Sequence, residues 1–210
     1  MINQFLSELR QFLPSDRIYT DELRTLGWGT DASFYRQIPK VVIRSDGEEE
    51  ISKIVQACRK YKLPFTFRAA GTSLSGQSCT DSVLIVAGKH WEKYELIDWS
   101  KEQGDESPNA IRLQPGIVGA RVNEILKPYG RVFPPDPASI GSAMVGGIVI
   151  NNASGMNCGV HANSDRMMVS TRIILTDGTV LDTGDEKSKE AFRKSHPEFL
   201  KKIEALRDKV

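Results

Sequence analysis

The chain has 210 residues, of which 40% are hydrophobic and 26% are charged. These proportions are those of a soluble globular protein, and a chain of this length buries roughly 70% of its unfolded surface, so it needs no disulfide or metal to be stable. A formal net charge of +1, with no basic run, argues against nucleic acid as a partner.

Residues 1–39 are predicted to form an N-terminal helical arm. Apolar side chains recur at helical spacing over residues 2–13, and Pro14-Ser15-Asp16 should end that helix. The side chains that define its apolar face are Phe5, Leu6, Leu9, Phe12 and Leu13.

A small strand–helix–strand lobe is predicted over residues 40–92. Residues 40–43 and 64–67 read as strands, which implies that they pair in parallel through a right-handed crossover. Residues 45–48 have the spacing of a capping box, and 83–86 read as a third strand. A helix is predicted between the first two strands, because apolar residues recur there at helical spacing, namely Ile51, Ile54, Val55 and Cys58.

The strand at 64–67 opens into Arg68-Ala69-Ala70-Gly71-Thr72-Ser73-Leu74-Ser75-Gly76-Gln77-Ser78. Two glycines allow backbone torsions that other residues resist, and successive N–H groups in such a turn can converge on one anion, with hydroxyl donors beside them. The loop follows a strand, where open α/β sheets bind ligands. We predict a phosphate-binding loop, and an ordinary turn is the alternative.

The same loop has the glycine spacing of a nucleotide-triphosphate site, since Gly71, Gly76 and Ser78 fit G-x-x-x-x-G-K-[ST]. Gln77 stands where the lysine should be, and a neutral amide cannot neutralise the charge of a transferred phosphate. A degenerate P-loop-like nucleotide-binding protein therefore stays only as an alternative. The Rossmann pattern G-x-G-x-x-G is absent after any predicted strand.

A second lobe is predicted over residues 93–185. It begins with a polar surface loop at 101–109 and a strand at 110–114, and a helical stripe then ends at 128–130. The apolar stripe of this helix consists of Val118, Val122, Ile125 and Leu126. Further along the chain, Asp177-Gly178 lies between two short apolar runs, residues 173–175 and 180–181, and predicts a hairpin.

Residues 186–210 are predicted to be a helical segment that leads to a missing cap domain. An apolar side is formed by Phe199, Leu200, Ile203 and Leu206. No C-terminal capping residue follows this predicted helix, which is what we expect if the chain is cut from a longer protein.

Residues 133–155 form the second segment of interest. Pro134, Pro135 and Pro137 stiffen its start, and the following glycines, alanines and serines have little side-chain bulk. Such backbone can lie against a flat ligand, and Asn151 and Asn152 supply donors and acceptors. A structural turn or a tightly packed strand would explain the same residues.

Cysteine and histidine usage excludes a metal centre. Cys58, Cys79 and Cys158 are an odd number without metal-ligand spacing, which fits a reducing compartment. Three cysteines cannot hold an iron–sulfur cluster that takes four. No secretory signal and no window long enough for a membrane span are present, so we expect a cytoplasmic protein.

The two motifs together resemble a known family. Residues 68–77, 134–139 and 146–155 look like the FAD-binding domain of the FAD-linked oxidases, the vanillyl-alcohol oxidase or PCMH-type fold. Gly155 to Gly159 is similar to the bacterial D-lactate dehydrogenase-like subgroup, which fuses a flavin module to an iron–sulfur module. The resemblance runs from about Lys40 to Gly184, and implies an α+β fold of two α/β lobes, a small mainly parallel lobe and a larger mixed or antiparallel one.

The resemblance also implies which residues contact FAD. Main-chain amides from Ala69 to Ser75 would hold the diphosphate, and Gly76 and Gln77 would continue towards the ribityl chain. The remaining implied contacts are Arg68 at the loop start, Ile174 at the adenine end, and Pro135, Asp136, Ser139, Gly141, Ser142, Gly146, Gly147, Asn152 and Gly155 around the ribityl chain and isoalloxazine ring.

The chemistry of the resembled family is oxidation of a small 2-hydroxy acid by hydride transfer to flavin N5, with later electron transfer to a second acceptor. Members with covalent FAD carry a histidine in the loop, and none occurs here, so the resemblance implies noncovalent FAD. Ala69-Ala70 replace the more usual glycines, and Ile148 stands where many members have asparagine. Cys158 fits a packed loop thiol better than a residue beside the flavin.

Three parts of the resembled family have no counterpart before Val210. They are the substrate cap, the returning segment that completes the flavin lobe, and the cysteine-rich cluster domain. The resemblance therefore places catalytic residues and any iron–sulfur cluster outside these residues, and we expect them to be inactive alone. A cofactor-free interaction domain that kept the fold, and a homodimer formed through exposed apolar surface, are the remaining possibilities.

Overall fold

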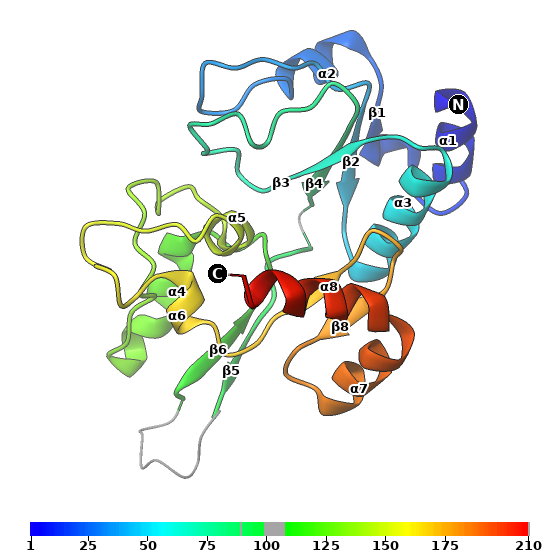
Figure 1. Cartoon of the computed structure of the whole chain (residues 1–210). Coiled ribbons are helices and arrows are strands. Elements are labelled where there is room, and N and C mark those ends of the chain that lie inside the picture. The colour runs from blue at the N-terminus through cyan, green and yellow to red at the C-terminus, as the bar shows by residue number, and fades with distance from the viewer. Residues whose placement is uncertain (89, 99–107, 210) are drawn as a thin grey trace.

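The computed structural model describes residues 1–88, 90–98 and 108–209. Its first lobe is built on a four-stranded sheet with the order β1-β2-β4-β3 (Figure 1). The strand β1 (Ile18–Tyr19) is antiparallel to β2 (Val41–Ser45), whereas β2 and β3 (Phe65–Arg68) both run parallel to β4 (Val83–Ala87). The predicted strands are confirmed.

The predicted direct pairing of the first two strands is wrong, because β4 lies between them. Val41 of β2 and Phe65 of β3 both lie opposite Val83. The strand β4 consists of apolar residues, and Leu84 has no exposed surface. A continuous apolar run of this kind is typical of a strand covered on both faces, which is the central position of the sheet.

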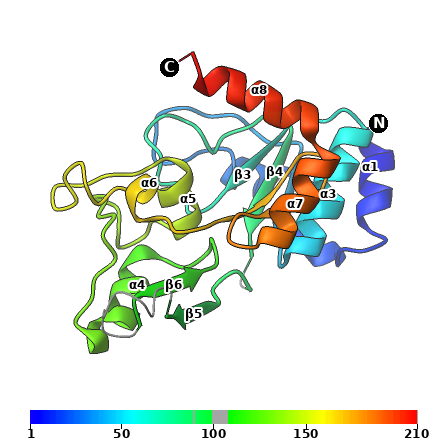
Figure 2. The ribbon, with the colours of Figure 1, turned by 60° about the horizontal axis from the view of Figure 1, so that its bottom comes forward.

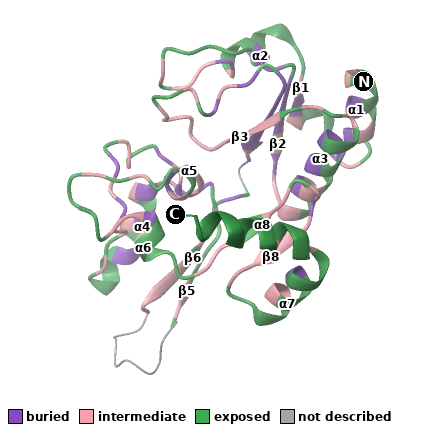
Figure 3. Ribbon diagram, viewed as in Figure 1, coloured by how far each residue is buried: buried purple, intermediate pink, exposed green. Residues whose placement is uncertain are grey.

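Helices cover this sheet and form the larger core (Figure 3). The predicted stripe of α3 (Glu48–Lys60) is buried, and α1 (Ile2–Leu9) packs against it, with the rings of Phe5 and Tyr61 6.2 Å apart. The helix α1 is shorter than predicted, because turns follow it before the 3-10 turn η1 (Ser15–Arg17). The next helix, α2, spans Glu22–Gly27.

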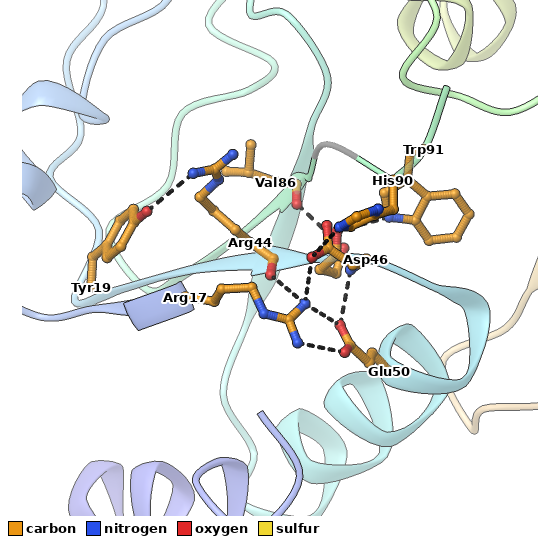
Figure 4. Close-up of polar contacts among 9 residues, drawn as sticks. Arg17, Tyr19, Arg44, Asp46, Glu50, Val86, His90 and Trp91 are labelled. Carbon is orange, nitrogen blue, oxygen red and sulfur yellow. Dashed lines mark hydrogen bonds and ion pairs between the residues drawn. The ribbon is translucent and has the colours of Figure 1, made fainter. Parts of the chain in front are cut away.

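The start of α3 is fixed by an ionic network and not by the predicted capping box. The N-cap is Gly47, and the carboxylate of Glu50 accepts the N–H of Asp46 at 2.9 Å. The guanidinium of Arg17 contacts Glu50 at 2.7 Å and Asp46 at 2.9 Å (Figure 4). The hydroxyl of Ser45 donates to the carbonyl of Val86 instead of capping the helix.

The second lobe has its own small core. The strands β5 (Tyr94–Ile97) and β6 (Ala110–Leu113) are antiparallel, and α4 (Gly119–Leu126) leads into the 3-10 turn η2 (Lys127–Tyr129). The core consists of Ile117, Val122, Leu126 and Val145, the last from α5 (Val145–Ile150). The predicted loop at 101–109 lies mostly outside the described residues.

The predicted hairpin forms from β7 (Arg172–Ile174) and β8 (Val180–Asp182), after the short helix α6 (Ser164–Met167). It joins the first lobe, because the Ser52 hydroxyl of α3 donates to the carbonyl of Gly178 at 2.6 Å. The helix α7 (Glu186–Ser195) lies on the same side of β3 and β4 as α3 (Figure 2).

The last helix, α8, spans Pro197–Arg207 and buries none of its residues. Its predicted apolar side is partly solvent-exposed, including Phe199, Ile203 and Leu206. No helix in the described part of the chain has the length and hydrophobicity that crossing a lipid bilayer requires. One mainly parallel sheet with an antiparallel edge strand, two antiparallel strand pairs among the described residues and separate helices make this an α+β fold, as predicted.

Candidate functional site

The predicted phosphate loop follows the carboxyl end of β3, on the same side of the molecule as α5 (Figure 1). Gly71 and Gly76 have φ angles of 72° and 70°, in the left-handed region that glycine adopts without strain. The N–H groups of Gly71, Thr72, Ser73 and Leu74 find no acceptor among the described residues. Four successive free amides of this kind are available to bind an anion.

The hydroxyl groups of the loop are less available than predicted. The Ser73 hydroxyl donates to Gln77 Oε1 at 2.8 Å and accepts the N–H of Ser75 at 3.2 Å. Ser78 is buried, and its hydroxyl donates to Asp31 at 3.1 Å. The hydroxyls of Ser73 and Ser78 are thus already bonded within the protein, whereas those of Thr72 and Ser75 form no hydrogen bond with the described residues.

The connection between β3 and β4 also differs from a nucleotide-triphosphate site. A P-loop leads directly into a helix, whose N-terminus helps to bind the phosphates. Residues 69–82 are all described and contain no helix. With the lysine absent as well, the loop lacks two parts that phosphate transfer requires.

A segment of the N-terminal arm holds the loop, which the sequence did not predict. The Ala32 N–H donates to the Gly71 carbonyl at 2.9 Å, and Arg68 Nη1 donates to the Thr30 carbonyl at 2.6 Å. The Tyr35 ring lies where a side chain at Gly76 would be, 2.8 Å from an ideal Cβ. The one sequence signal was Thr30-Asp31-Ala32-Ser33, a polar run typical of side-chain-bonded turns.

Asp31 is the polar centre of this segment. It accepts hydrogen bonds from the Ser33 N–H at 2.9 Å and from the Ser78 hydroxyl. Burial by itself would raise the pKa of Asp31, but the hydrogen bonds from Ser33 and Ser78 outweigh it and lower the pKa. Asp31 is therefore ionised at neutral pH and fixes the segment to the loop.

The second predicted segment contains the short helix α5, so a tightly packed strand there is wrong. The Val145 N–H donates to the Ile117 carbonyl at 2.8 Å, and the Gly146 N–H donates to the Pro115 carbonyl at 2.9 Å. An ideal Cβ on Gly146 would lie 2.6 Å from Pro115 Cβ. Glycine at this position allows the chain to pack against the proline.

The two predicted segments meet at Gly147. An ideal Cβ on Gly147 would lie 3.6 Å from Cβ of Ala69, the first residue of the phosphate loop. An alanine at position 147 would thus be in ordinary van der Waals contact with Ala69, a residue 78 positions away in the sequence. The small residues therefore allow the start of the loop to lie close to the backbone of α5.

The proline-rich start of the second segment packs against its end. An ideal Cβ on Gly155 would lie 1.4 Å from the carbonyl oxygen of Asp136, so only glycine fits there. Pro135 is buried, and the N–H and hydroxyl of Ser142 both donate to the Ser139 carbonyl. Asn152 adopts the left-handed backbone region, with a φ of 45°. Gly141 lies in open space, because an ideal Cβ there would have no atom within 4 Å.

Cys158 is a packed loop thiol, as expected. It is 4% exposed, and its sulfur accepts the N–H of Gly155 at 2.9 Å and contacts Asn163 Oδ1 at 3.2 Å. These contacts stabilise the turn that follows the glycine-rich segment.

Ile174 is placed apart from the other predicted contacts. It packs against the core of the first lobe, beside a cavity of about 540 Å³ at the amino end of β3. That cavity is lined by residues of α3, the hairpin and α8, including Cys58, Leu175 and Phe199.

The chemistry of this region is that of a binding site for a long anionic ligand. Free amides offer partial positive charge, and the adjacent small residues leave the backbone of α5 accessible. Within residues 1–88, 90–98 and 108–209, no group of three or more His, Cys, Asp or Glu side chains could hold a metal ion.

Comparison with known proteins agrees with this geometry. The family model of the FAD binding domain matches residues 39–184. D-2-hydroxyglutarate dehydrogenase of Escherichia coli (strain K12) is 27% identical over 87% of this chain and 18% of its own length. Glycolate oxidase subunit GlcD of Bacillus subtilis (strain 168) is 26% identical over 74% of this chain and 32% of its length.

A mitochondrial D-lactate dehydrogenase [cytochrome] of Arabidopsis thaliana is 28% identical over 90% of this chain and 32% of its own length. The chain thus spans between about a fifth and a third of these curated relatives. Among solved structures, alkyldihydroxyacetonephosphate synthase superposes with a TM-score of 0.71 at 19% identity, over 89% of this chain and 37% of the other. The chain belongs to the FAD binding domain family, and its fold is the PCMH-type fold that its sequence predicted.

Proposed function

We propose that these residues form the FAD-binding part of an oxidoreductase that oxidises a 2-hydroxy acid. The proximity of Gly147 to Ala69 carries the proposal, because the loop that begins at Ala69 contains four free amides and because the small residues at the start of α5 leave its backbone open to a flat ring system. When bound, FAD would supply the acceptor of a hydride from the substrate.

The residues that would hold FAD are divided between the two segments. Amides of Gly71 to Leu74 would bind the diphosphate, with the rest of Arg68 to Gln77 shaping the loop. The glycine-rich segment would line the ribityl chain and ring through Pro135, Asp136, Ser139, Gly141, Ser142, Gly146, Gly147, Asn152 and Gly155. A role for Ile174 at the adenine end requires the ligand to reach the hairpin. Residues 68–78 contain no histidine, so we propose noncovalent binding.

The substrate class rests on the names of the relatives, which act on D-2-hydroxyglutarate, glycolate or D-lactate. Catalytic residues are not assigned among the described residues, and we expect residues 1–210 by themselves to be inactive. An iron–sulfur cluster would need ligands beyond the three cysteines of these residues.

A flavin titration tests the cofactor assignment. Purified residues 1–210 should bind FAD and change its absorbance and fluorescence. Gly147→Leu should weaken binding at least about tenfold, because a larger side chain would press on Ala69 and fill the approach to α5. Gly27→Ala is the control, since nothing lies within 4 Å of an ideal Cβ there. Absence of FAD binding by the wild type would favour a cofactor-free interaction domain.

We propose a cytoplasmic location, because Cys58, Cys79 and Cys158 form no disulfide.

We also propose that exposed apolar side chains, such as Met156 at 98% exposure and Phe199, support a homodimer. Sedimentation of residues 1–210 tests this, and a monomer at micromolar concentration would contradict it.

A further inference from the structure

Arg68 lies directly beneath the phosphate loop. An ideal Cβ on Gly71 would lie 2.4 Å from Nη2 of Arg68 and 2.6 Å from its Cζ. The guanidinium therefore occupies the space that any other residue at this position of the loop would need. Gly71 supports the free amides on one side and contacts a cation on the other.

The charge of this cation is not neutralised by an ion pair. No carboxylate of the described residues lies within 4 Å of Arg68, and its Nε is buried without a partner among them. Burial lowers the pKa of Arg68, while the nearby Cys79 and Asp31 raise it. Although burial makes the pKa of Arg68 lower than usual, the arginine keeps its proton at neutral pH, because the ordinary pKa of a guanidinium lies far above neutrality.

The side chain is held in place by neutral groups of the N-terminal segment. Nη1 donates to the carbonyls of Thr30 at 2.6 Å and Trp28 at 3.4 Å. Cζ lies 5.2 Å from the centroid of the Trp28 ring, within the range of a cation–π interaction. These contacts fix the direction of the guanidinium by neutral groups, and the nearest negative charge that acts on it, that of Asp31, forms no direct ion pair with it.

We infer that Arg68 is a positioning residue for the diphosphate: its guanidinium, fixed by Trp28 and Thr30, supports the loop at Gly71 and supplies positive potential to the anion that the amides bind. The inference rests on the proposed function. It also gives a role to residues 28–35, which lie outside the part matched by the family model. A purely structural arginine in the same place would be expected to pair with a carboxylate.

The test compares FAD with riboflavin, which has the same ring system and no phosphate. Arg68→Met should weaken FAD binding about 10–100-fold, which corresponds to the loss of one charge-assisted interaction. The affinity for riboflavin should stay within about threefold of the wild-type value. Raising the ionic strength should weaken FAD binding less in this variant than in the wild type. Arg59→Met is the matched control, an exposed arginine of α3 that should change neither affinity.

Two results would overturn the inference while leaving the proposed function intact: equal FAD affinity in Arg68→Met and wild type, or equal losses for FAD and riboflavin. Failure of the wild type to bind FAD would instead reject the proposed function.

If Arg68→Met does not fold, the variant Asp31→Asn tests the inference in its place. It removes a negative charge near Arg68 and keeps one side-chain oxygen to accept from Ser33. An NH2 group would replace the oxygen to which Ser78 donates, so the Ser78 hydroxyl would have to accept at that position. The ratio of FAD to riboflavin affinity should then rise roughly twofold or more. An unchanged or lower ratio would overturn the inference.

Discussion

The two halves of the site are stabilised in different ways. The loop after β3 is attached to the larger core of the molecule and to residues 28–35 by hydrogen bonds and an ionised aspartate. The glycine-rich segment rests on a core of four buried residues, and carries exposed apolar side chains such as Ile150 and Met156. One half is preorganised by polar contacts, whereas the other depends on close backbone packing.

In the proposed function, the two halves would recognise different parts of FAD. A diphosphate needs fixed donors, which the loop after β3 would supply. A flat ring needs an accessible backbone and an apolar surface, which the second segment would supply. We therefore expect substitutions in the first half to change binding of the diphosphate, and those in the second to change binding of the ring system together with the stability of the lobe.

The largest expected effect comes from removing core volume in the first lobe. Leu84→Ala leaves a cavity in the central strand and should lower the free energy of unfolding by about 2–5 kcal/mol. Val122→Ala in the second core should cost less, about 1–3 kcal/mol, because the side chain is smaller. Urea unfolding measures both, and a larger loss for Val122→Ala would reverse the expected order of the two lobes.

Gly71→Ala should nearly abolish FAD binding, with a loss of about 100-fold. Alanine disfavours the φ of 72° and its Cβ would collide with the guanidinium of Arg68. Equilibrium titration with FAD measures the effect, and Gly47→Ala is the control, since its φ of −177° suits any residue. Retention of wild-type affinity would mean that the loop does not contact the cofactor.

Arg17→Met should lower the free energy of unfolding by about 1–3 kcal/mol. It leaves the carboxylates of Asp46 and Glu50 without the cation that joins the N-terminal arm to β2 and α3. Arg112→Met is the matched control, because its pair with Glu95 is exposed and should contribute less than about 1 kcal/mol. Equal losses in the two variants would remove any special role for the buried network.

The smallest effect concerns pH. A hydrogen bond from His196 lowers the pKa of Asp177 from 3.8 to about 2 in the folded protein. Because the folded-state pKa is depressed, the stabilisation is complete above about pH 4 and is lost as the pH falls towards 2. Asp177→Asn should remove roughly 1 kcal/mol of this pH dependence. Acid unfolding of both proteins checks it, and superimposable curves would contradict it.

Local patterns were the parts of the fold that the sequence predicted well. The spacing of Ile51, Ile54, Val55 and Cys58 identified the buried face of α3, and Asp177-Gly178 identified the hairpin. The loop after β3 was located because its glycines directly follow a strand, while phosphate binding by this loop stays a prediction. Each of these signals depends on residues that are close in the chain.

Long-range pairing was not predictable in the same way. Nothing in residues 40–67 indicates that β4 lies between β2 and β3, and the contact of residues 28–35 with the loop depends on tertiary packing. The run Val145 to Ile150 has β-branched residues that favour a strand, yet contacts of its first turn with Pro115 and Ile117 make it a helix. Which of the predicted site residues contact FAD stays a prediction.

The position of β4 has a consequence for how cofactor and fold depend on each other. Residues 69–82 are the crossover between two neighbouring parallel strands, so the crossover cannot close before both strands have paired. A ligand that binds only the closed crossover adds its binding free energy to the whole sheet. Saturation with FAD should therefore slow amide hydrogen exchange across β3 and β4, well beyond the atoms that the cofactor touches.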